Sequence, residues 1–283
     1  VKGWTQVLTD GGLHYCPNLP HLRPVPMRLP RLPDLLTTAN LCCGVTSVLL
    51  ASQGQLTIAC WLIFLAALFD VFDGLAARAL GGGTPLGAQL DSLADMVSFG
   101  VAPGILLGQL VGQPLAAQLL ISPDSVKDLE YDRIAFQIRL IAVPIAAIIP
   151  IASAWRLAKF NLDPRQTQGF LGLPTPANAL FWAGTYLGFE RLSPEQGAIL
   201  GQNWSNPWVA LSMAIALSAL MLLELPLPSL KFKHSKWKGN EVVFLLLGIG
   251  AVLVILCGFL AVPLILLLYL LSPLWGKLFP KTK

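Results

Sequence analysis

The stretch DVFDGLAARALGGGTPLGAQLDSLAD, residues 70–95, places four aspartates and one arginine between two hydrophobic segments. The whole chain has 283 residues, of which 55% are hydrophobic and 12% charged, and its mean hydropathy is +0.67. Apolar runs recur at lengths near the roughly 20 residues that a helix needs to cross a bilayer. This pattern predicts an all-α, polytopic membrane protein rather than a soluble globular domain.

Hydropathy predicts eight membrane helices, six in a core and two near the C-terminus. The core helices are expected at about 37–51, 56–80, 87–110, 135–157, 177–189 and 207–223, and Gly258 and Pro263 are expected to divide 242–274 into two. The predicted domains are a leader and interfacial segment (1–34), the core (35–225), and a basic loop with the C-terminal helices and tail (226–283). Met27 resembles a natural start, and residues before it form a Gly- and Pro-rich leader.

The distribution of basic residues predicts the orientation in the membrane. With eight helices and a cytoplasmic N-terminus, 15 of the 19 Lys and Arg residues fall on the cytoplasmic side and 4 on the outer side. Cytoplasmic loops carry an excess of Lys and Arg. We therefore expect a cell-membrane protein with both termini, and the loop after Arg78, in the cytoplasm.

The spacing of the aspartates indicates a metal site. Asp70 and Asp73 (i, i+3) share one helix face, Asp91 and Asp95 (i, i+4) share another, and GGGTP between them predicts a hairpin. Four anions in an apolar setting require neutralisation, and oxygen ligands favour Mg²⁺ or Mn²⁺, with room for two ions. Arg78 can contact a phosphate, and glycines at positions 74 and 87 leave space for a ligand near the backbone.

This spacing, D-x2-D-G-x2-A-R-x8-G-x3-D-x3-D, resembles the signature of the CDP-alcohol phosphatidyltransferase family at all eight fixed positions. The resemblance implies a six-helix membrane core, a homodimer, and attack of an alcohol on the lipid-bearing phosphate with CMP leaving. It implies that Asp70, Asp73 and Asp91 bind metal and that Asp95 binds metal and acts as general base. It assigns contacts with the CDP moiety to Gly74, Arg78 and Gly87.

Other segments resemble the phosphatidylserine synthase branch of that family, which implies CDP-diacylglycerol and L-serine as substrates. They are LLTTANLCCG, SFGVAP, RLAKFN and FLGLPTP, and Lys159 departs from the arginine usual in that branch. Arg156 is the candidate for binding the serine carboxylate. Ser98 and Asn161 are candidates for polar contacts with the acceptor.

Three alternatives stay open at this point. Another acceptor such as glycerol 3-phosphate, or an archaeal ether-lipid donor, would use the same motif. A prenyl transferase would place its acidic motifs on separate helices, and a divalent-cation transporter would distribute polar residues over several spans. No nucleic-acid partner is expected.

Overall fold

The computed structural model describes residues 4–9, 12–17, 30–119, 128–162, 170–192, 206–227 and 241–275. The chain divides into two compact units, Val1–Arg31 and Leu32–Lys283. In the first unit, β1 (Trp4–Thr9) and β2 (Gly12–Pro17) form an antiparallel hairpin that the sequence analysis did not predict. The suggested start at Met27 and the basic loop at 231–240 lie outside the described residues.

The second unit is built of helices, which confirms the all-α membrane fold. Counting α3, η2 and α4 as one, its described residues contain eight helical segments: α1 (Leu32–Ser52), α2 (Leu56–Ala79), α3 (Pro85–Asp95) with the π-helix η2 (Met96–Val101) and α4 (Ala102–Leu119), α5 (Asp128–Leu162), α6 (Thr175–Glu190), α8 (Pro207–Leu222), α9 (Glu241–Cys257) and α10 (Ala261–Trp275). The strand β3 (Phe170–Leu171) pairs antiparallel with β4 (Pro226–Leu227), joining the chain before α6 to the chain after α8.

Local sequence explains where several of these helices begin and end. The helix α1 begins at Leu32 rather than near Thr37, because a proline and an acidic residue both suit a first helical turn. Gly81 and Gly82, with φ of 87° and 113°, form the turn between α2 and α3. The predicted break at Gly258 is confirmed, with φ of 58° and a short 3₁₀ turn, η4 (Gly258–Leu260), between α9 and α10.

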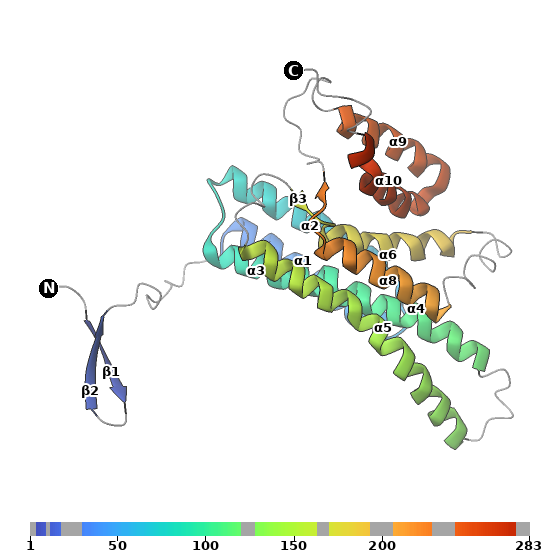
Figure 1. Ribbon diagram of the computed structural model, residues 1–283, viewed down its shortest axis with the longest axis horizontal. Helices are drawn as coiled ribbons and strands as arrows, with labels where there is room; N and C mark the ends of the chain where they lie inside the picture. The colour runs from blue at the N-terminus through green and yellow to red at the C-terminus, as the bar shows by residue number, and fades with distance from the viewer. Residues whose placement is uncertain are drawn as a thin grey trace. The chain divides into compact units, whose positions relative to one another are not determined.

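The helices of the core lie side by side (Figure 1). The helix α1 packs along α2 and also contacts α3, η2 and α4. The helix α4 packs against α5, and α5 packs against both η2 and α8. The helix α6 contacts α2, α4 and η2 on one side and α10 on another. The residues of η2 are therefore enclosed by α1, α5 and α6, while α3 packs against α1.

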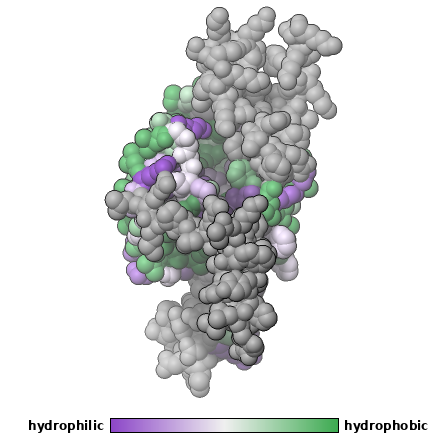
Figure 2. Space-filling view, turned by 90° about the vertical axis from the view of Figure 1, so that its left-hand side faces the viewer, coloured by the Kyte–Doolittle hydropathy of each residue, from purple (hydrophilic) through white to green (hydrophobic). Residues whose placement is uncertain are grey.

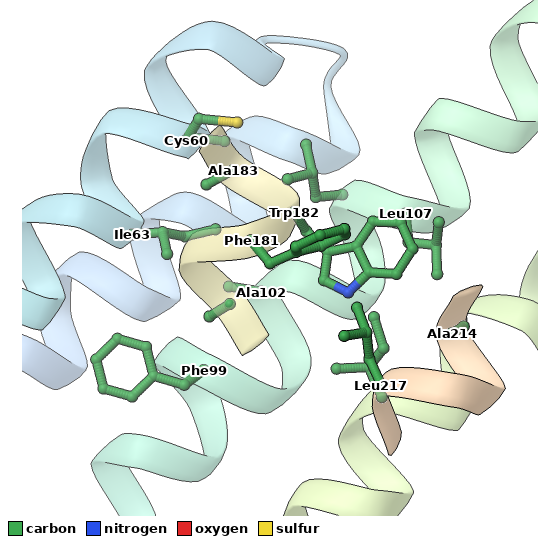
Figure 3. Close-up of a cluster of buried hydrophobic side chains, with 14 of the residues drawn as sticks. Cys60, Ile63, Phe99, Ala102, Leu107, Phe181, Trp182, Ala183, Ala214 and Leu217 are labelled. Atoms are coloured by element: carbon green, nitrogen blue, oxygen red, sulfur yellow. The ribbon is translucent and has the colours of Figure 1, made fainter. Parts of the chain in front are cut away.

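The core of the bundle centres on α6. Trp182 is fully buried, and Figure 3 shows its ring between Leu107 of α4 and Leu217 of α8. The neighbouring Phe181 ring meets it edge to face, with ring centroids 5.4 Å apart. Burial of such large apolar side chains, at roughly 25 cal/mol per Å² removed from water, fixes α6 between α4 and α8.

The outer surface of the second unit is apolar in a way typical of membrane proteins. Many large hydrophobic side chains are exposed, including Trp155 of α5 and Ile255 of α9, and Figure 2 shows apolar residues over much of the coloured surface. Five described helical stretches are long and apolar enough to cross a membrane: Leu32–Ser52, Leu56–Ala79, Pro85–Gly112, Phe136–Leu162 and Gly248–Leu271. The chain is a multi-pass membrane protein, and α6 and α8, at 16 residues each, are shorter than an ordinary span.

Candidate active site

Three aspartate side chains from two helices meet beside the turn that joins α2 to α3. Asp70 lies on α2, and Asp91 and Asp95 lie one turn apart on α3. One carboxylate oxygen of each residue lies within 4.8 Å of one carboxylate oxygen of each of the other two. Asp70 and Asp91 are half-buried and Asp95 is buried. The structure thus brings together three of the four residues predicted to bind metal.

The fourth aspartate, Asp73, lies beside this group and is held by α1. Its Oδ2 accepts a hydrogen bond of 2.7 Å from Thr37 Oγ1, and both residues are buried. The same hydroxyl lies 3.0 Å from the carbonyl oxygen of Pro33, one turn earlier on α1. Asp73 also interacts electrostatically with Asp70 and Asp91. The hydrogen bond fixes the orientation of the Asp73 carboxylate next to the other three.

Asp95 is also held from α1. Asn40 Nδ2 donates a hydrogen bond of 3.3 Å to Asp95 Oδ1, and the backbone carbonyl of Asn40 accepts one of 3.0 Å from Ser98 Oγ. Gly44 permits this contact, because a Cβ there would lie 2.8 Å from Ser98 Cα. The Ser98 hydroxyl, a predicted acceptor contact, therefore donates its proton to α1.

The backbone changes its winding directly after Asp95. The π-helix η2 begins at Met96, and Ser98, Phe99 and Gly100 within it are all buried. A π turn contains an extra residue per turn and often occurs at functional sites. Here it places consecutive residues against α1, α5 and α6 while the chain continues into α4.

The predicted contacts for a nucleotide lie around the same turn. Arg78 is exposed, and a Cβ on Gly74 would lie 4.0 Å from Arg78 Nη2. On α3, a Cβ on Gly87 would lie 2.9 Å from Asp34 Oδ1, so that glycine allows α1 to approach α3 closely. The Gly87 N–H donates to Thr84 Oγ1 at 2.9 Å, which caps the start of α3.

The helix α5 contributes a buried cation. Arg156 is 8% exposed, donates from Nη1 to Thr175 Oγ1 at 3.4 Å, and interacts electrostatically with Asp95. Its Cζ lies 5.9 Å from the centroid of the Phe160 ring. A buried guanidinium needs compensating negative charge, which Asp95 supplies.

Two further residues of α5 interact with other parts of the chain. Asn161, a predicted acceptor contact, is exposed and donates from Nδ2 to Ser92 Oγ at 2.9 Å. Lys159 forms an ion pair of 2.7 Å with Glu224, and the two side chains are 48% and 46% exposed. Lys159 stands where the related branch usually has arginine. Its ion pair links α5 to the chain after α8.

The aspartate cluster meets the requirements of a divalent metal site. Its donors are all carboxylate oxygens, the ligands that Mg²⁺ and Mn²⁺ prefer. Asp91 Oδ1 is buried and, among the described residues, has no hydrogen-bond partner. An unpaired buried carboxylate oxygen is unfavourable unless a cation or donor reaches it. The residues present therefore fit the metal that the motif implies.

Sequence reasoning missed the two residues of α1 that hold the aspartates. Thr37 and Asn40 lie within LLTTANLCCG, a segment used only for its resemblance to relatives. Their spacing of i, i+3 places both on one face of a mostly apolar helix. Buried polar residues in such a helix need polar partners, and this signal could have identified them.

Comparison with known proteins agrees with this geometry. The family model described as CDP-alcohol phosphatidyltransferase matches residues 31–222. A CDP-diacylglycerol–serine O-phosphatidyltransferase from Mycobacterium leprae is 30% identical over 246 residues, covering 84% of this chain and 72% of the relative. The protein of the same name from Helicobacter pylori is 27% identical over 224 residues, covering 78% and 81%. An archaetidylserine synthase from Methanothermobacter thermautotrophicus is 34% identical over 158 residues, covering 55% and 58%.

Proposed function

Because this chain belongs to the CDP-alcohol phosphatidyltransferase family, and is therefore an enzyme, we propose that it transfers a phosphatidyl group from CDP-diacylglycerol to L-serine. The products are phosphatidylserine and CMP. The observation that carries the proposal is the group of Asp70, Asp91 and Asp95, with oxygens within 4.8 Å of one another and a buried arginine interacting with Asp95. The names of the Mycobacterium leprae and Helicobacter pylori relatives support serine as the acceptor.

The donor binds at the turn between α2 and α3. In this proposal Gly74, Arg78 and Gly87 contact the CDP moiety. The exposed Arg78 guanidinium donates paired hydrogen bonds to a diphosphate, a geometry that arginine favours. Gly74 leaves room for the nucleotide beside the backbone of α2, whereas Asp34 occupies the space beside Gly87 and has to move for that contact to form.

The metal site consists of Asp70, Asp73, Asp91 and Asp95, which would hold two ions of Mg²⁺ or Mn²⁺. When bound, the ions neutralise the charge of the diphosphate. The chain's own contribution is to hold the carboxylates in place through Thr37 and Asn40. Divalent-metal dependence is a property of the family, and the choice of ions and their number belong to the proposal.

The chemical step requires one proton transfer and one exchange at phosphorus. Asp95 accepts the proton of the serine hydroxyl while the hydroxyl oxygen of serine attacks the phosphorus that carries diacylglycerol. A new P–O bond to serine forms, the bond from that phosphorus to the bridging oxygen breaks, and CMP leaves with that oxygen. The hydrogen bond from Asn40 orients the Asp95 carboxylate for this step.

The acceptor binds on the α5 side of Asp95. Arg156 is buried and interacts electrostatically with Asp95, and we propose that it binds the serine carboxylate. Ser98 can offer its oxygen as an acceptor, since its proton is donated to Asn40. Asn161 reaches a substrate only by leaving its hydrogen bond with Ser92.

The distribution of basic residues supports a cytoplasmic active site and cytoplasmic termini. That orientation gives water-soluble serine and CMP direct access to the aspartates. The family resemblance adds a homodimer, which light scattering of the purified protein in detergent would measure directly.

An acceptor panel tests the proposal. The purified chain in detergent, with CDP-diacylglycerol and Mn²⁺, is given L-serine, glycerol 3-phosphate or inositol phosphate, and CMP release is followed. Release with L-serine, at more than ten times the rate with either phosphate, is expected. Release with glycerol 3-phosphate and none with serine would overturn the choice of acceptor. A parallel series replaces CDP-diacylglycerol with a CDP-linked archaeal ether lipid, because one relative is named an archaetidylserine synthase. Faster CMP release from the ether lipid would overturn the choice of donor.

A further inference from the structure

The helix α6, whose Thr175 accepts a hydrogen bond from Arg156, also carries a buried asparagine with no hydrogen-bond partner among the described residues. Asn178, in the first turn of α6, is 0% exposed. Among the residues that the structure describes, neither its Nδ2 nor its Oδ1 has a hydrogen-bond partner. Burying an unpaired amide destabilises a protein, so such a group calls for an explanation, and a bound ligand is one.

The position of Asn178 links it to Arg156. Thr175 lies one turn earlier on the same face of α6, is 0% exposed, and accepts the hydrogen bond from Arg156 Nη1. The Nε of Arg156 is itself buried and has no partner among the described residues. Arg156 in turn interacts with Asp95, the proposed general base.

A third buried polar group occurs on the adjoining face of α5. Ser153 is 0% exposed, lies one turn before Arg156, and its hydroxyl has no partner in the described part of the chain. It touches η2, because a Cβ on Gly100 would lie 3.1 Å from Ser153 Cβ. Both α5 and α6 pack against η2. Polar atoms without partners among the described residues therefore occur on α5 and on α6, the two helices that pack against η2, which directly follows Asp95.

We propose that Asn178 determines acceptor specificity by accepting a hydrogen bond from the acceptor's ammonium group at Oδ1, while Arg156 binds the carboxylate of the same molecule. The inference rests on the proposed function, in which the acceptor is an amino acid. A zwitterion with adjacent ammonium and carboxylate groups needs an acceptor and a cation close together. Asn178 and Arg156, joined through Thr175, provide both.

The charges of α5 favour this acceptor over one that carries a phosphate. A phosphate group would be bound best by a second cation beside Arg156. The next basic residue of α5, Lys159, is paired with Glu224 at 2.7 Å. An uncharged amide at position 178 complements an ammonium group without repelling it, whereas it adds no charge to hold a phosphate.

The test compares Asn178→Leu with wild type, both as full chains in detergent. The acceptors are L-serine and 3-hydroxypropanoate, which keeps the hydroxyl and carboxylate but lacks the ammonium group. The variant is expected to raise the KM for L-serine at least tenfold and leave the KM for CDP-diacylglycerol within twofold. The preference for L-serine over 3-hydroxypropanoate is expected to fall by about the same factor. Thr185→Val is the matched control, since Thr185 is buried on the same helix and its hydroxyl donates to Phe181 of that helix.

The melting temperature separates specificity from structure. Because the amide has no hydrogen-bond partner in the described part of the chain, Asn178→Leu is expected to melt at or above the wild-type temperature. A variant that does not fold, or whose two KM values rise together with unchanged acceptor preference, overturns the proposal. An unchanged KM for L-serine overturns it as well. Wild-type protein that uses another alcohol and not serine refutes the proposed function itself, a result independent of the variant.

Discussion

Replacing Thr37 with valine is expected to weaken metal binding at the aspartate cluster. Valine keeps the shape of threonine but removes the hydroxyl that donates to Asp73 Oδ2 at 2.7 Å. A hydrogen bond to a charged group contributes about 1.5–3 kcal/mol, which corresponds to roughly 10- to 150-fold in an equilibrium constant. The hydroxyl also lies 3.0 Å from the Pro33 carbonyl and shares its single proton, so we expect a value near the lower end. The prediction is a roughly tenfold weaker affinity for Mn²⁺.

The affinity can be measured in two ways. Electron paramagnetic resonance of free Mn²⁺ gives a dissociation constant without turnover, and CMP release gives the half-saturating Mn²⁺ concentration. Thr38→Val is the matched control, because Thr38 is the exposed neighbour and its hydroxyl donates to Asp34 O of its own helix at 2.7 Å. The reasoning is refuted if Thr37→Val binds Mn²⁺ within twofold of both wild type and Thr38→Val.

Three further substitutions test other parts of the site. Asp95→Asn is expected to reduce kcat at least about 100-fold, because general-base catalysis supplies 10²–10⁴-fold; near-full kcat in the CMP assay removes that role. Gly44→Ala places a Cβ 2.8 Å from Ser98 Cα and is expected to lower the free energy of unfolding by about 1–3 kcal/mol, so wild-type stability in chemical denaturation contradicts the close contact. Lys159→Met breaks a half-exposed ion pair with Glu224 and is expected to change stability by less than about 1 kcal/mol and activity by less than twofold; a large loss of activity would give Lys159 a role at the substrate.

The positions of the helices and the proximity of the aspartates could be predicted from the sequence, because both depend on local patterns of residues. Hydropathy located the helices to within a few residues at most ends, and glycine with positive φ explains the break at Gly258. Residues spaced by one turn share a face wherever a helix forms, so the Asp91 and Asp95 pair followed directly from spacing.

Other features depend on contacts between helices, which one-dimensional patterns do not specify. The partners of Asp73 and Asp95 are on α1, distant in sequence from both. The π turn after Asp95 arises where α1, α5 and α6 enclose the chain, and MVSFGV has no local signal that distinguishes it from an α-helix. The hairpin of residues 4–17 was missed because its sequence shows no regular apolar alternation.

The buried polar groups that lack a partner among the described residues could not be predicted from the sequence either. Asn178 is the second residue after Gly-Leu-Pro-Thr-Pro (172–176) and the fourth residue of α6, where asparagine commonly lies at a surface. Its burial follows from packing of α6 against η2 and α10, which only the three-dimensional arrangement reveals.

Incorporation of radiolabelled L-serine into extractable lipid tests the central claim most directly. The purified chain is stripped of metal with EDTA, supplied with CDP-diacylglycerol, and assayed before and after Mn²⁺ is restored. The account predicts labelled phosphatidylserine in equal amount to CMP, only when Mn²⁺ is present, and loss of both in Asp95→Asn. Label entering lipid at the same rate without metal, or CMP released with no labelled lipid, would contradict it.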